Sequence, residues 1–197
     1  MVEEITQGED ARKNWEDPAA RWVWPDSQRL LMHFHSFVRA FGDKAFIHGS
    51  AYYVDDYIGA ALWLPPDVHP DENALIALLH RTVSEQIQKD VFAVFEEMGR
   101  YPPSEPRWYL LIMGVDPLQQ GRGFGSALLQ HALIQCDRNS RPAYLESSNP
   151  RNIPLSERHG FELLGTIQTG KWPSIAPRLR RLGNTTNIVV YLQVVDF

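Results

Sequence analysis

Apolar residues recur at helical spacing in several stretches of the 197-residue chain. The helices predicted along the chain cover residues 28–41, 71–80, 84–98, the stretch that follows the glycines at 121–125, and 151–159. Asp26 or Ser27 is placed to cap the first of them, and Gly42-Asp43 is predicted to end it. Gly160 is expected to end the last helix.

Shorter apolar runs, bounded by Pro, Gly or Asp, are typical of β-strands. Such runs predict strands at residues 45–54, 57–65, 108–115, 143–148, 161–168 and 187–195, and a short edge strand through Thr6. The first two of the longer strands meet at Asp55-Asp56, which predicts a hairpin. The segment "WEDPAARWVWPD", residues 15–26, is interpreted as a helix end followed by a loop.

Strands and helices alternate without a break in composition, which favours a mixed α/β (α+β) fold around one sheet. No Gly/Ser-rich linker, long charge run or internal repeat divides the chain, so residues 1–197 are predicted to form a single domain. The length and the 44% apolar composition are sufficient for one sizeable core.

The net charge of −5 argues against general binding of nucleic acids, which depends on Lys and Arg that neutralise phosphates. Four basic residues nevertheless lie in one late segment: Lys171, Arg178, Arg180 and Arg181. They form either a local contact for an anion or a solvated basic loop. No stretch resembles a signal peptide or is long enough to span a bilayer. We therefore expect a soluble, cytoplasmic protein without a membrane partner.

Cysteine and histidine provide little chemistry in this sequence. Cys136 is the single cysteine and has apolar neighbours, so it is expected in the core rather than as a nucleophile. His33 and His35 lie two positions apart on a predicted helix and therefore point to different faces, which argues against a shared metal ion. No metal site is predicted.

The stretch "QQGRGFGS" carries the strongest functional signal. Three glycines at alternate positions, Gly121, Gly123 and Gly125, separate a buried strand from a helix. Backbone N–H groups at a helix N-terminus lack partners and favour anions, and glycines allow a phosphate to approach them closely. No lysine follows as in a Walker A loop, and the Gly-x-Gly-x-Gly spacing differs from a dinucleotide fingerprint.

The loop does match the pattern Gln/Arg-x-x-Gly-x-Gly/Ala, and its six residues "QGRGFG" resemble the pyrophosphate loop of the GNAT N-acetyltransferase superfamily. "ESSNPRNIPLSERHGFELLG" is similar to a later block of that superfamily. Within it, "WYLLIMGVDP", "YLESSNPRN" and "GAALWLPP" most resemble the puromycin N-acetyltransferase-like branch. The resemblance extends over residues 107–165 and, less closely, 45–66.

This resemblance implies a fold and a reaction. The fold would be a central twisted mixed sheet of about six to seven strands, mostly antiparallel and flanked by helices, with splayed parallel strands at its centre. The reaction would be direct transfer of an acetyl group from acetyl-CoA to the amine of a small molecule. The loop residues implied to hold the pyrophosphate are Gln120, Gly121, Arg122, Gly123, Phe124, Gly125 and Ser126.

Further roles along the coenzyme follow from the same resemblance. Backbone groups of Met113 and Val115 would pair with the pantetheine arm, and Asn152 would lie near it, although Asn152 also suits a helix cap. Gly114 suggests a bulge or a close backbone approach in this strand.

The catalytic residues are less clearly marked. Glu146 lies on the strand beside the cleft, as a base for the amine or as a surface or salt-bridged carboxylate. Ser156 occupies the position where the superfamily often has a tyrosine that protonates the leaving thiolate. A serine is a far weaker acid, so Ser156 either holds a water or is an ordinary helix residue. His159 is expected on the outer face of its helix.

The acceptor and the assembly stay open in the sequence. Trp15, Trp22 and Trp24 are candidates to stack on a hydrophobic or aromatic amine, or to be core residues. A catalytically weak acetyl-CoA-binding protein is the alternative to an enzyme, favoured by Ser156, and acetylation of proteins is a third possibility. A monomer or a homodimer paired through the last strand is expected.

Overall fold

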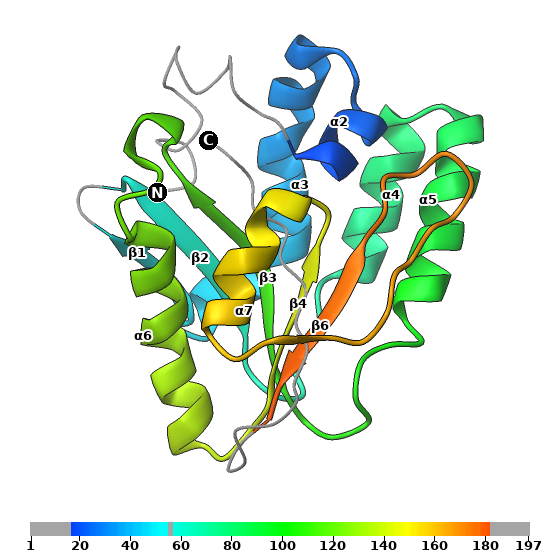
Figure 1. The fold of residues 1–197 in the computed structure, drawn as a ribbon. Coiled ribbons are helices and arrows are strands. Elements are labelled where there is room, and N and C mark those ends of the chain that lie inside the picture. The colour runs from blue at the N-terminus through cyan, green and yellow to red at the C-terminus, as the bar shows by residue number, and fades with distance from the viewer. Residues whose placement is uncertain (1–16, 55–56, 182–197) are drawn as a thin grey trace.

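A six-stranded sheet with the order β1-β2-β3-β4-β6-β5 organises the computed structural model, which describes residues 17–54 and 57–181 (Figure 1). Its strands are β1 (Ala51–Val54), β2 (Gly59–Leu64), β3 (Trp108–Val115), β4 (Ala143–Ser147), β5 (Glu162–Leu163) and β6 (Ala176–Arg180). Neighbouring strands are antiparallel except for the parallel pair β3 and β4. The predicted mixed, mostly antiparallel sheet with a central parallel pair is confirmed.

Helices cover both faces of this sheet. They are α2 (Pro18–Val23), α3 (Ser27–Ile47), α4 (Glu72–Thr82), α5 (Glu85–Met98), α6 (Phe124–Arg138) and α7 (Ile153–Arg158), with short turns η2 (Pro117–Gln119) and η3 (Pro150–Asn152). Figure 1 shows α7 in front of the strands and α3 behind them. None of the helices in the described ranges is long and apolar enough to cross a membrane.

Two glycines show how α3 and α6 approach β2 from opposite sides. An ideal Cβ at Gly42 of α3 would lie 2.6 Å from a methyl group of Leu62, and one at Gly59 would lie 3.3 Å from a methyl group of Leu128 on α6. Successive residues of a strand point to opposite faces, so Leu62 and Gly59 belong to different faces. The sheet therefore has one face under α3 and the other under α6.

The predicted end of the first long helix at Gly42-Asp43 is wrong. Gly42 lies inside α3, which continues to Ile47, because the glycine serves a close contact with Leu62 instead of stopping the helix. Consequently β1 begins at Ala51 and is shorter than the predicted strand 45–54. Glycine as a helix breaker was a correct general rule that tertiary packing overrode at this position.

The segment 15–26 also differs from its interpretation as a helix end. Asp17 caps a new helix, since its carboxylate accepts a hydrogen bond of 2.7 Å from the backbone N–H of Ala20, and Pro18 takes the first helical position. Asp followed by Pro is a typical helix start, because proline lacks the N–H that would have no partner there. The short helix α2 results.

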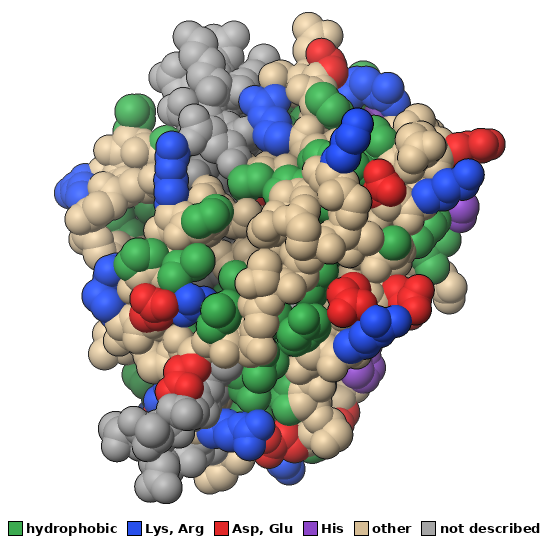
Figure 2. Space-filling view, turned by 45° about the vertical axis from the view of Figure 1, so that its right-hand side comes forward, with side chains coloured by type: hydrophobic (Ala, Val, Ile, Leu, Met, Phe, Trp, Pro, Cys, Tyr) green, Lys and Arg blue, Asp and Glu red, His purple; other side chains and the backbone are tan. Residues whose placement is uncertain are grey.

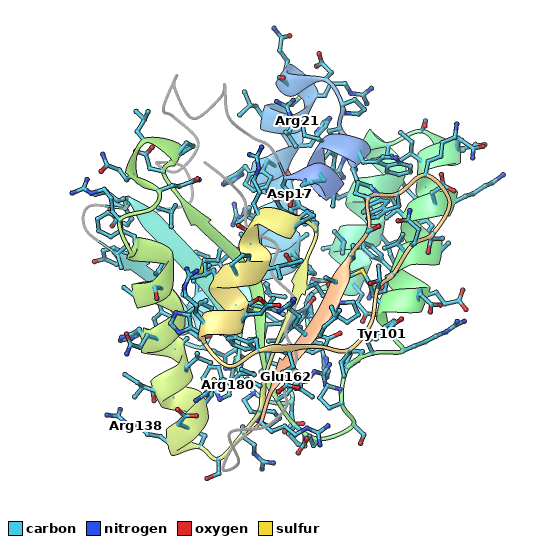
Figure 3. The ribbon with its side chains drawn as sticks, in the orientation of Figure 1. Asp17, Arg21, Tyr101, Arg138, Glu162 and Arg180 are labelled. Atoms are coloured by element: carbon cyan, nitrogen blue, oxygen red, sulfur yellow. The ribbon has the colours of Figure 1, made fainter. Side chains whose placement is uncertain are left out.

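The late basic segment contains the strand β6, which holds Arg178 and Arg180, whereas Lys171 and Arg181 lie outside the strand and are exposed. Arg178 is only 3% exposed and donates to a carboxylate oxygen of Glu157 at 2.8 Å. Arg180 makes two hydrogen bonds of 2.6 and 2.8 Å with Asp137 (Figure 3). Arg178 and Arg180 are therefore paired with acidic residues within the fold. Their charges interrupt the apolar pattern, so hydropathy did not predict this strand.

Other elements follow their predictions more closely. The strand β3 has the predicted bounds, and α4 and α5 occupy the two predicted helical stretches. The predicted strand 161–168 is reduced to β5 and an isolated bridge between Ile167 and Ile175. The N-terminal strand, the Asp55-Asp56 connection and the strand 187–195 lie outside the described residues. Figure 2 shows acidic and basic side chains interspersed with hydrophobic ones on one face.

Candidate functional site

The parallel strands β3 and β4 separate shortly after they pair. Their ladder joins only three residue pairs, from Trp108↔Ala143 to Leu110↔Leu145. Beyond this point β3 continues to Val115 and β4 to Ser147, and the two strands diverge toward their carboxyl ends (Figure 1). The predicted splay is confirmed, and it leaves a gap between the two strands, where the β4-facing edge of β3 pairs with no strand of the described residues while its other edge stays paired with β2.

A bulge in β3 lies at the start of this gap. Against β2, Leu110 pairs with Trp63 and Ile112 pairs with Leu62, so Leu111 is the extra residue. The bulge suggested at Gly114 is therefore misplaced, because Gly114 keeps its regular partner Ala60. Bulges increase the local twist of a strand, which accounts for the separation of β3 from β4 directly after Leu110.

The glycine loop connects the end of β3 to α6. Gly121 and Gly123 have φ values of 74° and 91°, in the left-handed region that favours glycine, and no atom lies within 4 Å of a Cβ placed on either. The first backbone hydrogen bond of α6 runs from Ala127 to Gly123. The N–H groups of the three residues before Ala127 therefore have no partner within the helix and form its positive end.

Gly125, the third glycine of the loop, allows close packing between elements. An ideal Cβ at Gly125 would lie 3.3 Å from Leu155 of α7 and 3.8 Å from both Met113 and Val115 of β3. Gly125 thus allows the first turn of α6 to pack against both elements. Met113 and Val115 point to the α6 face of the sheet, under the glycine loop.

Side chains around the loop are tied to it. Gln120 donates to the carbonyl of Val115 at 3.3 Å, and the guanidinium of Arg122 donates to Gln119 and lies 5.5 Å from the ring centre of Phe124. The loop as a whole is exposed. Gln120 therefore fixes the loop to the end of β3, while Arg122 places a positive charge beside the free N–H groups.

His159 was expected on the outer face of its helix, and this is wrong. Its Nε2 atom lies 2.6 Å from the hydroxyl of Ser126, in a hydrogen bond that joins the end of α7 to the first turn of α6. The side chain is half-buried, and burial, with the charges of Arg158 and Arg180, lowers the pKa of His159 below its ordinary value. It connects two elements beside the glycine loop.

Glu146 is on β4, across the gap from β3 and its glycine loop, one residue beyond the last β3–β4 pair. It is 5% exposed and accepts a hydrogen bond of 2.9 Å from the hydroxyl of Tyr109. Burial raises the pKa of Glu146 to about 8, although Tyr109 and the charge of Arg107 act to lower it. Of the two readings of this residue, a surface carboxylate does not describe the buried side chain.

Tyr109 places this carboxylate on the α3 face. The ring of Tyr109 makes an edge contact with Phe41 of α3, with 6.5 Å between ring centres. Tyr109 and Tyr144 share a face, because their rings lie 5.3 Å apart and the two residues are paired in the ladder. Glu146 follows Tyr144 by two positions and faces the same side. Tyr109 was not singled out in the sequence.

Asn152 and Ser156 lie at α7. The side-chain nitrogen of Asn152 is buried and has no hydrogen-bond partner among the described residues, and its side chain does not cap the helix. Ser156 is 0% exposed, and its hydroxyl donates to the carbonyl of Ile153 at 2.8 Å. Asn152 therefore offers a donor without a partner, whereas the hydroxyl of Ser156 is already bonded within its own helix.

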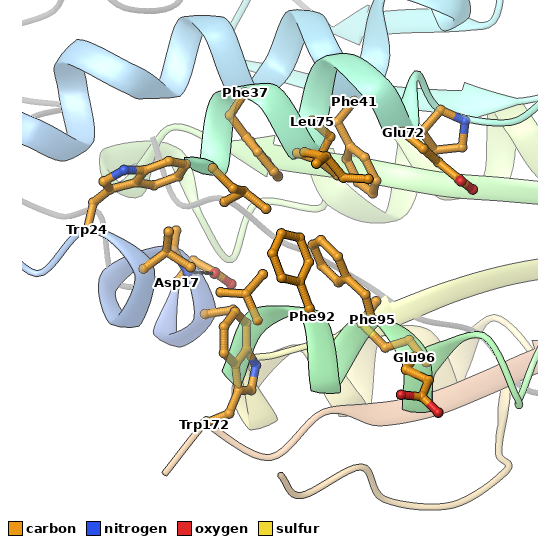
Figure 4. Close-up of a pocket in the computed structure, with 18 of the residues that line it drawn as sticks. Asp17, Trp24, Phe37, Phe41, Glu72, Leu75, Phe92, Phe95, Glu96 and Trp172 are labelled. Atoms are coloured by element: carbon orange, nitrogen blue, oxygen red, sulfur yellow. Dashed lines mark hydrogen bonds between the residues drawn. The ribbon is translucent and has the colours of Figure 1, made fainter. Parts of the chain in front are cut away.

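A pocket of about 460 Å³ lies on the α3 face, between α2, α3, α4, α5 and the start of β3 (Figure 4). Its wall is mostly apolar, and eight of the lining side chains are aromatic: Trp24, Phe34, Phe37, Phe41, Phe92, Phe95, Tyr109 and Trp172. Among the predicted tryptophans, Trp24 lines the pocket, Trp22 packs on Trp172 with 4.7 Å between ring centres, and Trp15 lies outside the described residues.

Asp17 connects this pocket to the end of β4. The carboxylate is 4% exposed, lines the pocket, caps α2 and accepts a hydrogen bond from the hydroxyl of Ser148 (Figure 3). Because Asp17 and Ser148 are 131 residues apart, no local pattern in the sequence could have revealed this contact.

Comparison with known proteins identifies the architecture. The model of the acetyltransferase (GNAT) family matches residues 10–161, more than three quarters of the chain. The chain belongs to the acetyltransferase (GNAT) family. The superfamily predicted from the glycine loop is therefore confirmed.

Individual relatives of this GNAT chain are distant. An uncharacterised N-acetyltransferase of Schizosaccharomyces pombe is 29% identical over 128 residues, which are 58% of this chain and 51% of that protein. The GNAT chain thus spans about half the length of this curated relative. The structural matches cover nearly the whole chain and show the fold.

One of them is a structure described as histone acetyltransferase HPA2 and related acetyltransferase from Corynebacterium glutamicum, with a TM-score of 0.59, 20% identity, and coverage of 94% of this chain and 93% of that one. The polyamine N-acetyltransferase of Drosophila melanogaster, which catalyses the formation of N-acetylagmatine, has a TM-score of 0.56 and 17% identity, with coverage of 92% and 95%. Both share the GNAT fold of this chain.

Proposed function

We propose that this protein transfers an acetyl group from acetyl-CoA directly to the amine of a small molecule. One observation carries the proposal. The gap between β3 and β4 has the glycine loop on the α6 face and a buried carboxylate, Glu146, beside an aromatic pocket on the α3 face. A coenzyme bound to the loop and an amine bound in the pocket would meet through this gap.

The chain's own residues fit the coenzyme. The unpaired N–H groups at the start of α6 and the cation of Arg122 suit a pyrophosphate, because both favour negative charge. Backbone groups of Met113 and Val115 are proposed to pair with the amides of the pantetheine arm, on the edge of β3 that no longer pairs with β4. The buried nitrogen of Asn152 would donate to the same arm and gain the partner that it lacks.

Glu146 is proposed as the base. Bound acetyl-CoA supplies the thioester; the protein must bring the amine to it and remove a proton from the attacking nitrogen. The Glu146 carboxylate is held by Tyr109 at the point where the strands separate, and its pKa of about 8 suits a base that works near neutral pH. The proton is taken directly or through one water.

Ser156 is proposed to support α7 rather than to act as an acid. Its hydroxyl already donates to Ile153, and a serine is a poor proton donor. A thiol has an ordinary pKa of about 8.5, so a departing thiolate does not require a strong acid near neutral pH. The same observation favours the alternative function, an acetyl-CoA-binding protein with little or no turnover. Release of free thiol distinguishes the two.

Calorimetric titration of acetyl-CoA into the protein tests the loop. We expect saturable binding, reduced more than about 30-fold in Gly123→Val, because a β-branched side chain neither adopts φ of 91° without strain nor leaves space for a phosphate. Gly49→Val is the matched control, since Gly49 is exposed, has φ of 63° and likewise has no atom within 4 Å of a placed Cβ. Absence of binding to the unaltered protein would reject the proposed function.

A further inference from the structure

The wall of the pocket is built for a flat, apolar ligand. Six rings from α3, α5 and the segments around Trp24 and Trp172 converge on it, as Figure 4 shows for Trp24, Phe37, Phe41, Phe92, Phe95 and Trp172. The volume of about 460 Å³ falls in the range of sites that enclose small organic ligands. Aromatic walls favour an aromatic guest, because rings gain both burial and offset or edge contacts.

Three carboxylates, Asp17, Glu72 and Glu96, and the guanidinium of Arg107 line the pocket. Asp17 accepts hydrogen bonds through both carboxylate oxygens, from Ala20 and from Ser148. Glu72 and Glu96 are exposed and lie at the other end of the pocket from Asp17, on opposite sides of it (Figure 4). Glu96 also pairs with Arg100 at 3.2 Å.

Arg107 adds a positive charge to the same wall. Its guanidinium lies 5.1 Å from the ring centre of Tyr144 and is close enough to act on the pKa of Glu146. An uncharged aromatic body gains burial and ring contacts from this wall without the desolvation cost that a charged tail carries.

The pocket also leads to the reacting position. Tyr109 lines the pocket and donates to Glu146, so a ligand held between the rings of α3 and α5 can direct an amine along Tyr109 toward the gap in the sheet. The ligand therefore needs one amine at the end nearest Tyr109 and an apolar body behind it.

We infer that the acceptor is an arylalkylamine, a primary amine carried on an uncharged aromatic body, and not a polyamine or a guanidino amine. The inference rests on the proposed function and names its substrate class. It sets this chain apart from the structurally similar enzyme that forms N-acetylagmatine. The reaction forms the C–N bond of an amide and breaks the C–S bond of acetyl-CoA, and the proton lost by the amine nitrogen ends on the departing thiolate, which is released as the free thiol.

Two measurements on the full chain separate the inference from the proposed function. Calorimetry in the presence of coenzyme A, which cannot react, compares tryptamine with agmatine, and a thiol-release assay with acetyl-CoA compares kcat/KM for the same amines. We expect tryptamine to bind at least about 10-fold more tightly and to react correspondingly better, as expected for one buried aromatic group. Tighter binding of agmatine, or binding of neither amine, overturns the inference.

Binding of tryptamine without thiol release would support the inference and reject catalysis. Acetylation of agmatine in preference to tryptamine would support catalysis and overturn the inference. The two proposals therefore fail in distinguishable ways.

A variant locates the effect in the pocket. Phe92→Ala removes a half-buried ring from α5, and we expect about 10-fold weaker binding of tryptamine, with n-butylamine changed less than about twofold. Ile134→Ala, on the exposed side of α6, is the control and should change neither. Equal effects of Phe92→Ala on both amines, with unchanged thermal unfolding, would contradict the assignment.

Discussion

The glycine loop and the aromatic pocket lie on opposite faces of one sheet and are built from different kinds of structure. The loop is contiguous, from Gln119 to Ser126, and its proposed anion site consists mainly of backbone N–H groups. The pocket is assembled from side chains between Asp17 and Trp172, which the fold brings together. A site made of local backbone is readable in a motif, whereas a site made of distant side chains depends on the packing of the whole domain.

The strongest test of this division is Glu146→Gln. The variant keeps the shape of the side chain and removes the base, so we expect kcat to fall by about 100-fold or more, while the affinity for acetyl-CoA stays unchanged. Kinetics with a saturating amine and a titration of acetyl-CoA measure the two quantities. An equal loss in both would mean that Glu146 belongs to the coenzyme side.

The same carboxylate should govern two pH profiles. Because the base must be ionised, kcat/KM of the unaltered protein should rise with pH until about 8 and then level off. Stability changes in the other direction: the pKa is about 8 in the folded protein and near 4.5 when unfolded, so the folded state is destabilised as pH rises from about 4.5 to 8.

Glu146→Gln should abolish this loss of stability. Urea unfolding of both proteins at pH 5, 7 and 9 is the measurement. We expect the free energy of unfolding of the variant, minus that of the unaltered protein, to increase up to about pH 8 and to stay constant above it. Parallel stability curves for the two proteins would show that Glu146 is ionised throughout.

Asn152→Ala probes the coenzyme side with a smaller expected effect. Loss of one hydrogen bond from a buried donor corresponds to about 1 kcal/mol, and so to roughly 5- to 10-fold weaker binding of acetyl-CoA. The Kd for tryptamine should stay the same. Thermal unfolding is expected to be unchanged or slightly improved, since the donor has no partner in the protein; a marked loss of stability would assign Asn152 a structural role instead.

Ser156→Ala should have the smallest effect on the reaction. The substitution removes a hydroxyl that bonds to Ile153, so we expect a loss of about 1 kcal/mol or less in stability and less than about a threefold change in kcat. Steady-state thiol release at pH 7 and 9 is the measurement. A large fall in kcat, greater at pH 7, would identify Ser156 as part of the proton path to the thiolate.

The contrast between a contiguous loop and a pocket of distant side chains also explains which parts of the structure could be predicted from sequence. The strand β3 and the glycine loop have strong local signals, an apolar run and alternate glycines, and the family followed from them. The strand β6 was missed because its arginines are neutralised by residues distant in sequence, such as Glu157 and Asp137. Gly42 was misread for the same reason, since the partner that requires it is Leu62 of another element.

The pocket shows the same limit at the level of function. Phe92 and Phe95 of α5 look in sequence like any apolar helix face, and only the arrangement of four helices leaves a cavity in front of them. Tyr109 had no signal of its own within a bulky strand, although it holds the proposed base.

The extra residue in β3 has a consequence for the parity of that strand. Tyr109 and Met113 are four positions apart, an even number, and in an unbroken strand they would point the same way. Here Tyr109 contacts α3 and Met113 lies under α6, because the inserted Leu111 reverses the alternation between them. In the proposed function, one strand thereby serves the amine before the reversal and the coenzyme after it. Deleting Leu111 would keep the two side chains on opposite faces, since three steps along a regular strand also reverse the direction, but it would remove the bulge that twists β3 away from β4.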